Sequence, residues 1–542
     1  MVERYDVIIV GGGHNGLIAG TYLAKAGKRT LVVEQAATAG GLSQSDHVIP
    51  EAPAHMINTG AAELIHIRAS PVMQELDLRS HGWKTVETDP MYAYLDPDGG
   101  SIAVFRDPRR TAEDIARYSK ADARAYLEFI ELIDALMQFA GALGKGDPGA
   151  RTTSNYLDLA RVAIRNRAFK GRLQLLSTAP ADQLAAEWFE HPATQALLLG
   201  VVAGAGPFDT DGNGVAYALF GLLHRVGVSK AVGGMRMVAD ALVSAYLASG
   251  GTLMLNAEAG EILIQDGSTR GVRLRDGRRL EADVVIATCD PVSAARLATP
   301  GGLDRTTRTR LEYAPAHRAN VGPSLINVAS SRPFRLKRHQ DLRKDGVDLN
   351  QAVGLIGGAD ELRRALVQAR RGQVPAAPVF SVSPMTNWDP SMAPEGQGVA
   401  YLYLPVFPVD VNAGWATAKP AAAQAVVARA ADYYDGFDAE LGRWFETCPD
   451  REGRTGLTRG CVTHVDFGAQ RAGVKRPAFG LGGPAPLAPG FFLGGAGIHP
   501  GGGVSGGPGR LVSRRVLDYL ARGAAVRSSP PSAAPAAPRP HS

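Results

Sequence analysis

The segment YDVIIVGGGHNGLIAGTYLAKAGKRTLVVE, residues 5–34, has the pattern of a complete βαβ unit. Residues 5–10 form a short apolar run rich in β-branched side chains, which predicts a buried parallel strand. A glycine-rich turn follows, and residues 15–26 then predict a helix that is closed by Gly27. Residues 29–33 predict a second strand. The segment therefore indicates an α/β protein built on a Rossmann-type fold.

The glycine-rich turn has the spacing GxGxxG and lies directly between the predicted strand and helix, which is the context that a dinucleotide-binding loop requires. Gly11 permits the tight turn, Gly13 lets the backbone approach a pyrophosphate, and Gly16 lets the helix pack closely on the strand. The loop residues that we predict to bind the cofactor are Gly11, Gly13, His14, Asn15 and Gly16.

An acidic residue and a second glycine pair indicate which dinucleotide is bound. Glu34 ends the second predicted strand, where a carboxylate accepts hydrogen bonds from ribose hydroxyls and repels a 2′-phosphate. Gly40 and Gly41 follow six residues later, a spacing typical of FAD domains. Because the chain has one GxGxxG fingerprint and not two, we predict FAD as the cofactor, without a tightly bound nicotinamide partner.

Composition narrows the function classes. The chain has 542 residues, too many for one core, so two connected domains are expected. A net charge of +5 with 7% aromatic residues does not indicate nucleic-acid binding.

The three cysteines, Cys289, Cys448 and Cys461, form no CxxC pair, which argues against a disulfide framework, a metal site and a redox-active dithiol. There is no secretory pattern at the N-terminus, and the apolar stretch 193–208 is too interrupted to span a membrane. We therefore expect a cytoplasmic protein, or one peripheral at a membrane.

Beyond the first unit the chain reads as a helical region followed by a β-rich one. Residues 70–230 are expected to be mostly helical, whereas short apolar runs and two Asp-Gly turns predict a β-meander over 253–287. A glycine cluster covers 494–509, a helix is predicted at about 510–522, and the Ala/Pro/Ser-rich residues 524–542 predict a disordered tail.

The glycine cluster is the most distinctive motif of the chain. Residues 494–506, GGAGIHPGGGVSG, followed by Pro508-Gly509-Arg510, resemble the C-terminal signature of phytoene-dehydrogenase-like flavoproteins. Several other segments are similar to the branch with the animal pyridine-nucleotide-disulfide-oxidoreductase-like protein and the bacterial carotene ketolases. They are His14-Asn15-Gly16, Val232-Gly233-Gly234-Met235, Asp290-Pro291, residues 389–396 (DPSMAPEG), Gly460 with His464, and Arg476-Pro477.

This resemblance implies a Rossmann-type FAD-binding domain with an interleaved α+β substrate domain, as in amine oxidases and phytoene desaturases. The FAD domain would comprise residues 1–70, 229–300 and 485–523, and the substrate domain residues 71–228 and 301–484. Ala259 would meet the adenine end of the cofactor. The residues expected along the ribityl chain and flavin ring are Gly495, Ala496, Gly503 and Val504. The chain departs from many relatives at Ala39 and Leu42, which flank Gly40-Gly41 and replace arginines.

The resemblance also implies an enzyme that removes two hydrogens from a carbon–carbon bond of a lipophilic, isoprenoid-like substrate, with oxygen or a quinone as electron acceptor. Alternatives are an oxygen-using oxidase or carotenoid ketolase, an amine oxidase, and a non-catalytic flavoprotein with structural FAD. His499 and His464 are the candidate catalytic side chains, because both lie in motifs expected near the flavin. A basic segment around Arg161 to Arg172 either rests on an anionic membrane or is a solvated face.

Overall fold

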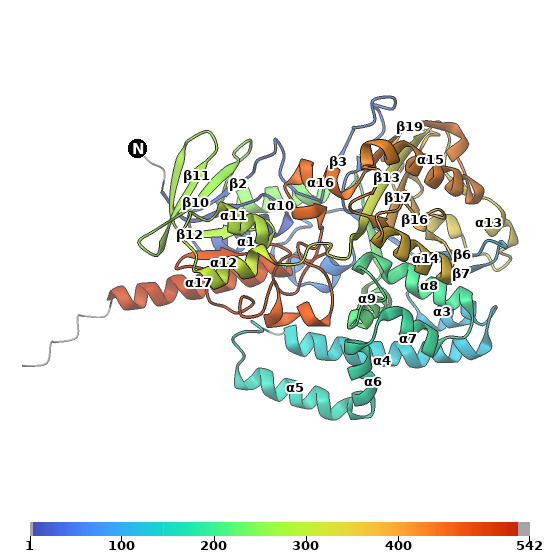
Figure 1. Ribbon diagram of the computed structural model, residues 1–542, viewed down its shortest axis with the longest axis horizontal. Helices are drawn as coiled ribbons and strands as arrows, with labels where there is room; N and C mark the ends of the chain where they lie inside the picture. The colour runs from blue at the N-terminus through green and yellow to red at the C-terminus, as the bar shows by residue number, and fades with distance from the viewer. Residues whose placement is uncertain (1–3, 145, 529–542) are drawn as a thin grey trace, which may run out of the picture.

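The computed structural model describes residues 4–144 and 146–528 and shows an elongated molecule with a large sheet toward each end (Figure 1). The N-terminal βαβ unit forms as the sequence predicts, with strand β1 (Arg4–Val10), helix α1 (His14–Lys25) and strand β2 (Thr30–Val33). The predicted α/β fold class is therefore confirmed.

The first sheet has the strand order β10-β11-β12-β1-β2-β9, with β20 paired to β12. Strand β1 runs parallel to both β12 and β2, and Val7, Ile8 and Ile9 are fully buried because helices cover both faces. The remaining strands of this sheet are β9 (Thr252–Met254), β10 (Ala259–Gln265), β11 (Ser268–Leu274), β12 (Arg279–Ala287) and β20 (Phe491–Leu493).

Helix α1 packs between α10 (Arg236–Ala248) and α17 (Gly507–Ser528). A Cβ atom on Gly20 would lie 2.7 Å from Cε2 of Tyr246, so glycine at this position permits the close approach of α1 and α10. Helix α17 continues beyond the predicted end at residue 522. The predicted disordered tail is thus wrong for its first five residues, 524–528, and its remainder, 529–542, lies outside the described residues.

The second sheet has the order β19-β13-β17-β16-β15-β6-β7, and its pairs are antiparallel except for β15 with β6. All ten residues of β13 are buried, because β17 and β19 flank it and side chains cover both of its faces. The strands are β6 (Tyr92–Leu95), β7 (Ser101–Val104), β13 (Val321–Ser330), β15 (Val353–Ile356), β16 (Phe380–Pro384), β17 (Gly398–Pro408) and β19 (Glu440–Glu446).

A layer of helices covers one side of the second sheet, seen below it in Figure 1. Its members are α3 (Pro108–Ile115), α4 (Lys120–Gly144), α5 (Thr153–Arg165), α6 (Lys170–Thr178), α7 (Ala181–Trp188), α8 (Pro192–Val202) and α9 (Ala218–Val226). The expectation of a mostly helical region from 70 to 230 misses the strands between residues 85 and 104. These strands are short. β6 and β7 pair with each other as a hairpin, but β5 and β6 also pair with distant segments of the chain, β8 and β15.

Short two-stranded pairs and single helices complete the fold. The pairs are β3 (Ser45–Asp46) with β4 (Ile57–Asn58), β5 (Thr85–Thr88) with β8 (Val228–Ala231), and β14 (Arg335–Leu336) with β18 (Tyr434–Asp435). The helices are α2 (Val72–Glu75), α11 (Pro291–Leu297), α12 (Arg305–Glu312), α13 (Arg338–Leu342), α14 (Ala359–Arg370), α15 (Trp415–Tyr433) and α16 (Cys448–Thr455).

The first sheet draws its strands from three separated stretches, 4–33, 252–287 and 491–493, each of which falls inside a segment assigned to the FAD domain. The exact domain boundaries stay a prediction. Among the described helices, none is long and apolar enough to cross a membrane.

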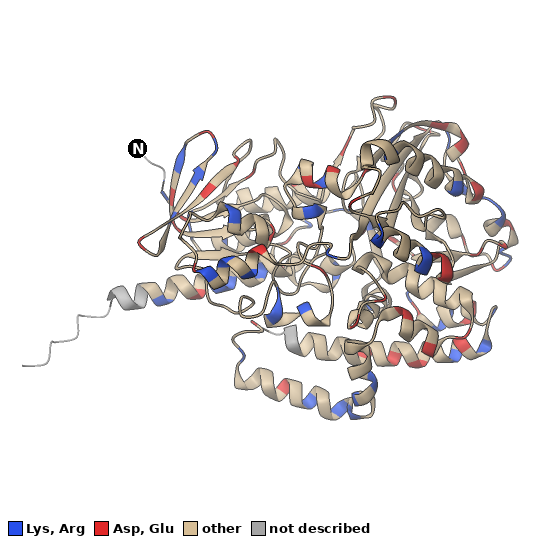
Figure 2. Cartoon of the chain, viewed as in Figure 1, with Lys and Arg blue, Asp and Glu red and all other residues tan. Residues whose placement is uncertain are grey.

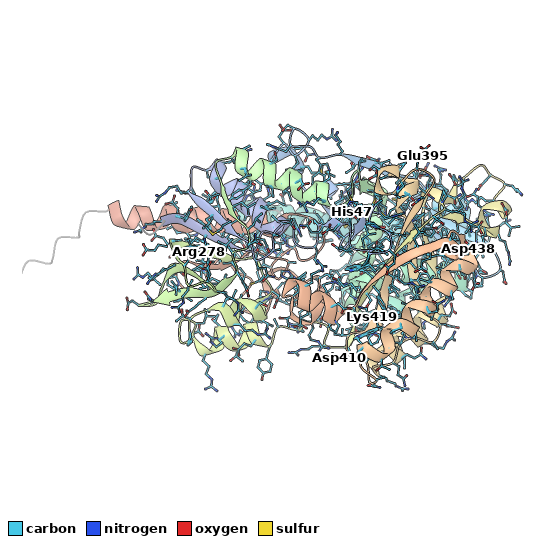
Figure 3. All side chains as sticks on the ribbon, turned by 90° about the horizontal axis from the view of Figure 1, so that it is seen from above. His47, Arg278, Glu395, Asp410, Lys419 and Asp438 are labelled. Carbon is cyan, nitrogen blue, oxygen red and sulfur yellow. The ribbon has the colours of Figure 1, made fainter. Side chains whose placement is uncertain are left out.

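Most of the described charged residues, whose places along the chain Figure 2 marks, are exposed or half-buried. Figure 3, a view from above, labels His47, Arg278, Glu395 and Asp438, and all four are exposed. The buried charges are few, and the most conspicuous of them adjoin the cavity described next.

Candidate active site

A cavity of about 890 Å³ lies where the two sheets face each other, a volume at the upper end of the range for ligand pockets. Its wall includes Gly11, Gly13, Glu34 and Gly41 from the side of the first sheet, and residues such as Leu355 from the second sheet. It therefore joins the predicted dinucleotide loop to the region assigned to substrate.

The dinucleotide loop is shaped to receive an anion. Gly13 precedes α1, no described side chain caps this helix, and its first turn carries no acidic residue. The N–H groups of the first turn are thus available to a pyrophosphate, and the helix dipole favours negative charge there. Gly11 has a φ of +105°, a conformation that favours glycine, and the backbones of Gly13 and Gly41 approach each other.

Glu34 lies at the end of the cavity that we assign to the adenosine half of the cofactor. Its carboxylate accepts hydrogen bonds from the N–H groups of Gly12 at 2.7 Å and Ala36 at 2.9 Å. The N–H of Ala257 donates to the carbonyl of Glu34 at 2.8 Å, which brings the turn before Ala259 beside it. Ala259 lines the cavity, as predicted.

Two arginines at this end were missed by the sequence reasoning. Arg275 and Arg296 both line the cavity, and Arg275 forms an ion pair with Glu258. They place positive charge near the end of the cavity assigned to the adenosine half of the cofactor. The chain thus has arginines at this end, although Ala39 and Leu42 stand where many relatives carry arginines. No local motif marks either residue, because each reaches the cavity only through the folding of β11 and α11.

The C-terminal glycine cluster reaches the cavity in part. Ala496, Gly503 and Val504 line it, and their contact with the ribityl chain and flavin ring stays a prediction. Gly495 and Gly40 are not among the described lining residues. A Cβ on Gly495 would lie 2.8 Å from Cε1 of His464, so this glycine lets the chain pass behind that ring. Gly40 forms an isolated β-bridge with Gly13 and supports the loop from behind.

His464 and His14 both line the cavity as neutral imidazoles. Burial lowers the pKa of His464 to about 4, with the nearby Asp290 carboxylate opposing the shift. Burial likewise lowers the pKa of His14 to about 4, with a further contribution from His464. Among the described residues, neither Nδ1 of His464 nor Nε2 of His14 has a hydrogen-bond partner. Each ring therefore has a buried nitrogen whose hydrogen-bonding capacity no described residue fills.

A third histidine, His66, was missed by the sequence reasoning. It lines the cavity, and a Cβ on Gly503 would lie 2.8 Å from its Nδ1 atom. Burial lowers its pKa. A lone histidine in a loop carries no sequence signal that distinguishes it from the other histidines outside the predicted motifs.

His499, the other predicted catalytic residue, is not placed for that role. It does not line the cavity in the described part of the chain, and its charged neighbours are Arg515 and Asp147, which form an ion pair. Burial is the main cause that lowers its pKa to about 4. The loop of the glycine cluster turns its neighbours Ala496 and Gly503 toward the cavity instead, so the ring of His499 does not reach a ligand bound there.

Ser43 tests whether the cavity suits a polar cofactor. The residue is fully buried and lines the cavity, yet its hydroxyl finds no partner within the described structure. A buried hydroxyl without a hydrogen bond is unfavourable, so a bound polar group is expected beside it. With the uncapped helix, Glu34 and the two unsatisfied histidine nitrogens, the residues present fit a dinucleotide flavin.

The part of the cavity toward the second sheet combines apolar side chains with polar ones, which include Ser381, Tyr401, Tyr403 and Arg451. Val201 from α8, Leu325 from β13 and Leu355 from β15 line it together with Leu219 and Trp444. Such apolar side chains bind a lipophilic molecule by removing its surface from water. This half is therefore suited to a substrate, and the other half to a cofactor.

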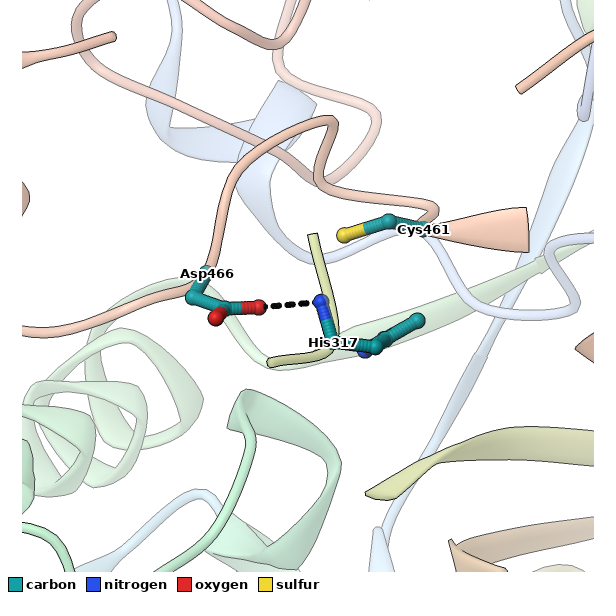
Figure 4. A group of neighbouring side chains, drawn as sticks. All are labelled: His317, Cys461 and Asp466. Atoms are coloured by element: carbon teal, nitrogen blue, oxygen red, sulfur yellow. Dashed lines mark hydrogen bonds between the residues drawn. The ribbon is translucent and has the colours of Figure 1, made fainter. Parts of the chain in front are cut away.

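A separate group, His317, Cys461 and Asp466, has potential metal-ligand atoms within 4.8 Å of one another (Figure 4). The Asp466 carboxylate already accepts hydrogen bonds from the N–H groups of His317 at 2.7 Å and Arg318 at 3.3 Å. Burial raises the pKa of the Cys461 thiol to about 11, which disfavours the thiolate that a metal needs. These hydrogen bonds to the turn at His317 and Arg318 account for the position of the Asp466 carboxylate. We therefore assign no metal to this group.

Comparison with known proteins identifies the family. The model of flavin-containing amine oxidoreductases matches residues 16–508. The chain belongs to this family. It is accordingly a flavin-containing oxidoreductase, and the predicted relationship to phytoene-dehydrogenase-like proteins is confirmed. For the family as a whole, the implied cofactor is FAD.

Relatives of similar sequence span nearly the whole chain. Pyridine nucleotide-disulfide oxidoreductase domain-containing protein 2 of Rattus norvegicus is 26% identical over 95% of this chain and 94% of its own length. A limonene dehydrogenase protein of Castellaniella defragrans is 23% identical over 96% and 95%. The lycopene-forming phytoene desaturase of a Paracoccus species is 24% identical over 95% and 97%.

Solved structures support the fold. Wild-type putrescine oxidase bound to putrescine is similar with a TM-score of 0.61 and 18% identity, over 96% of this chain and 99% of that one. Cyclohexylamine oxidase from Brevibacterium oxydans is similar with a TM-score of 0.54 and 15% identity, over 96% and 99%. At this identity the likeness establishes the amine-oxidase-like architecture, not the substrate.

Proposed function

We propose that the chain binds FAD along the cavity and dehydrogenates a carbon–carbon bond of a lipophilic, isoprenoid-like substrate. The pyrophosphate would lie at the N-terminus of α1, the adenosine ribose at Glu34, and the flavin ring between Gly503 and the second sheet. Bound FAD supplies the acceptor for a hydride. The observation that carries the proposal is the continuity of a polar, dinucleotide-shaped half with a half that carries apolar side chains in one cavity.

The relatives favour this reaction over amine oxidation. Two of them, the limonene dehydrogenase protein and the phytoene desaturase, are named for hydrocarbon substrates and match about 95% of the chain. Putrescine oxidase and cyclohexylamine oxidase match in structure at only 18% and 15% identity. An oxygen-using oxidase or a carotenoid ketolase is the second candidate, and a non-catalytic flavoprotein the third.

Dehydrogenation removes a hydride and a proton, and the chain must receive the proton. His464 is a neutral imidazole in the cavity wall, and we propose that its ring accepts the proton from substrate. Its low pKa means that the proton passes on to solvent rather than staying on the ring. Oxygen or a quinone would then reoxidise the flavin.

We also propose peripheral contact with an anionic membrane through α5, which lies at the lower edge of the molecule (Figure 1). No residue of α5 is buried, and the exposed fractions of Tyr156, Leu157 and Ile164 are 60%, 54% and 67%. Basic side chains accompany them on this helix and the next turn (Figure 2): Arg161, Arg165, Arg167, Lys170 and Arg172. Exposed apolar groups beside basic ones are typical of helices that lie in a membrane interface.

The test of the proposed function is the visible spectrum of the purified holoprotein, followed anaerobically as lipophilic candidates are added. Flavin bands that bleach with an isoprenoid, and an alkene product with one more double bond, are the expected result. Bands that bleach only with amines would favour an amine oxidase, and bands that no compound bleaches would favour a structural FAD. A protein that never takes up FAD would contradict the proposal as a whole.

A further inference from the structure

A buried ionic cluster adjoins the apolar side chains of the substrate half. Lys230, on β8, is fully buried, and its Nζ atom lies 3.0 Å from Oε1 of Glu63 and 3.4 Å from Oγ of Ser383. The hydroxyl of Tyr92 donates a hydrogen bond to Oε2 of the same carboxylate. The ammonium also lies 4.6 Å from the centre of the Trp388 ring.

Stability alone does not account for this cluster. Removing a carboxylate and an ammonium from water is unfavourable, and the mutual attraction of a buried pair often only offsets that loss. Replacement of a buried ion pair by apolar residues of similar volume is often neutral or stabilising. A buried ion pair that adjoins a ligand cavity is therefore better explained by what it binds.

Glu63 is the member of the cluster that faces the cavity. Its side chain retains 24% exposure, whereas that of Lys230 retains none, and Glu63 lines the cavity together with Tyr92 and Ser383. A carboxylate has about four acceptor positions, and the protein fills one on each oxygen. Glu63 thus keeps acceptor capacity at the cavity surface, while Lys230 and Tyr92 fix its orientation.

The chemistry of this surface selects a particular group on the ligand. A pure hydrocarbon would leave the carboxylate facing apolar atoms, whereas a hydroxyl would donate a hydrogen bond to it. A ligand ammonium is less favoured, because Lys230 already neutralises Glu63 and would repel a second cation.

We infer that Glu63 binds the hydroxyl group of a lipophilic alcohol and so positions it in the substrate half of the cavity. The inference rests on the proposed function and narrows its substrate class from lipophilic compounds in general to lipophilic alcohols. Glu63 is then a specificity-determining residue, and Lys230 and Tyr92 are positioning residues.

The experiment compares two probes that differ only in the donor, farnesol and farnesyl methyl ether. Their affinities for the FAD-loaded protein are measured without turnover, by perturbation of the flavin spectrum and by quenching of the tryptophan fluorescence, to which Trp444 in the cavity wall contributes. Wild type is expected to bind farnesol about ten- to a hundredfold more tightly than the ether, the effect of a hydrogen bond to a charged acceptor.

Two variants separate recognition from folding. Glu63→Gln should reduce the preference for farnesol over farnesyl methyl ether, but it leaves Lys230 unpaired and can destabilise the protein. The double variant Glu63→Leu with Lys230→Met removes both charges, so it should fold, retain FAD and abolish the preference. Glu128→Gln, at an exposed position on α4, is the matched control and should keep the wild-type preference.

Equal binding of the two probes by wild type, or a preference that the double variant retains, would overturn the inference. So would tighter binding of farnesylamine than of farnesol, since the cluster would then recognise a cation. If farnesol binds with the Glu63-dependent preference but never reduces the flavin, the inference stands and the proposed dehydrogenation fails.

Discussion

The N–H of Gly12 donates a hydrogen bond to Oε2 of Glu34 at 2.7 Å, so the carboxylate at the end of β2 is tied to the glycine loop that follows β1. The same carboxylate accepts from Ala36 and keeps lone pairs for a ligand at the cavity wall. One side chain therefore supports the conformation of the loop and takes part in the site that we assign to the ribose.

The first prediction concerns this carboxylate. Glu34→Ala removes an acceptor for the ribose and leaves the Gly12 N–H without its partner. Hydrogen bonds to charged acceptors contribute about 1.5–3 kcal/mol each, so we expect FAD to bind about ten- to a hundredfold more weakly. Fluorescence titration of the apoprotein with FAD measures this. Unchanged affinity would contradict the assignment of the ribose to Glu34, and Glu128→Gln is the control.

The second prediction concerns Gly503, which combines a φ of +82° with a Cβ position 2.8 Å from Nδ1 of His66. Gly503→Ala should therefore strain the backbone and displace a ring at the cavity wall. We expect lower thermal stability and a lower FAD content in the purified protein. Gly396→Ala is the matched control, because its φ is +78° and no atom lies within 4 Å of the added Cβ. If both variants lose the same amount of FAD, the contact between the added Cβ and His66 does not determine FAD retention.

How far the sequence alone predicts this site depends on whether a residue belongs to a local pattern. Gly13 and Glu34 could be predicted, because the spacing of a βαβ unit dictates their place at the end of adjacent parallel strands. Glu63 and Lys230 could not, because they are 167 positions apart and meet only when their neighbours Leu64 and Ser229 form an antiparallel bridge. Ser43 is likewise an ordinary loop serine until the fold buries it.

The same distinction applies to the fold. The first sheet follows from runs such as residues 5–10, whose apolar, β-branched character is legible in isolation. Strand β6 was missed because it has only four residues and lies between the equally short β7 and β15, and the residues of β15 lie about 260 positions away. His499 was placed near the flavin on the strength of its motif, but the conformation of the loop directs its neighbours, not its own ring, into the cavity.

The third prediction is a pH dependence of stability. Burial lowers the pKa of His464 from 6.5 to about 4 in the folded protein. Between these two pH values the unfolded chain binds more protons at His464 than the folded protein does. The contribution of the neutral His464 ring to the free energy of unfolding is therefore complete above pH 6.5 and is lost as the pH falls toward 4. The free energy of unfolding should therefore fall with acidification across this window, as measured by urea unfolding.

His464→Gln should make the unfolding free energy of the protein less sensitive to pH between 6.5 and 4, because the titrating ring is gone. Replacement of the exposed His47 by Gln is the control and should leave the wild-type slope unchanged. An identical slope in His464→Gln and wild type would show that the ring is not buried as a neutral group. The same variant should reduce flavin more slowly if His464 receives the substrate proton.

The last prediction concerns α5 and a membrane surface. Each Lys or Arg near an anionic bilayer contributes about 1 kcal/mol, so Arg161→Gln, Arg165→Gln and Arg167→Gln together should weaken binding to phosphatidylserine-containing vesicles by on the order of a hundredfold. Cosedimentation at low and high salt measures this, and binding should weaken as salt rises because the surface potential is screened.

Tyr156→Ser with Ile164→Ser should weaken binding at both salt concentrations, since it removes apolar area that would insert into the interface. Tyr313→Ser is the matched control, because this tyrosine is 70% exposed and lies outside α5. If wild type does not sediment with these vesicles at low salt, the charges of α5 are simply a solvated face, and a lipophilic substrate must reach the cavity from solution.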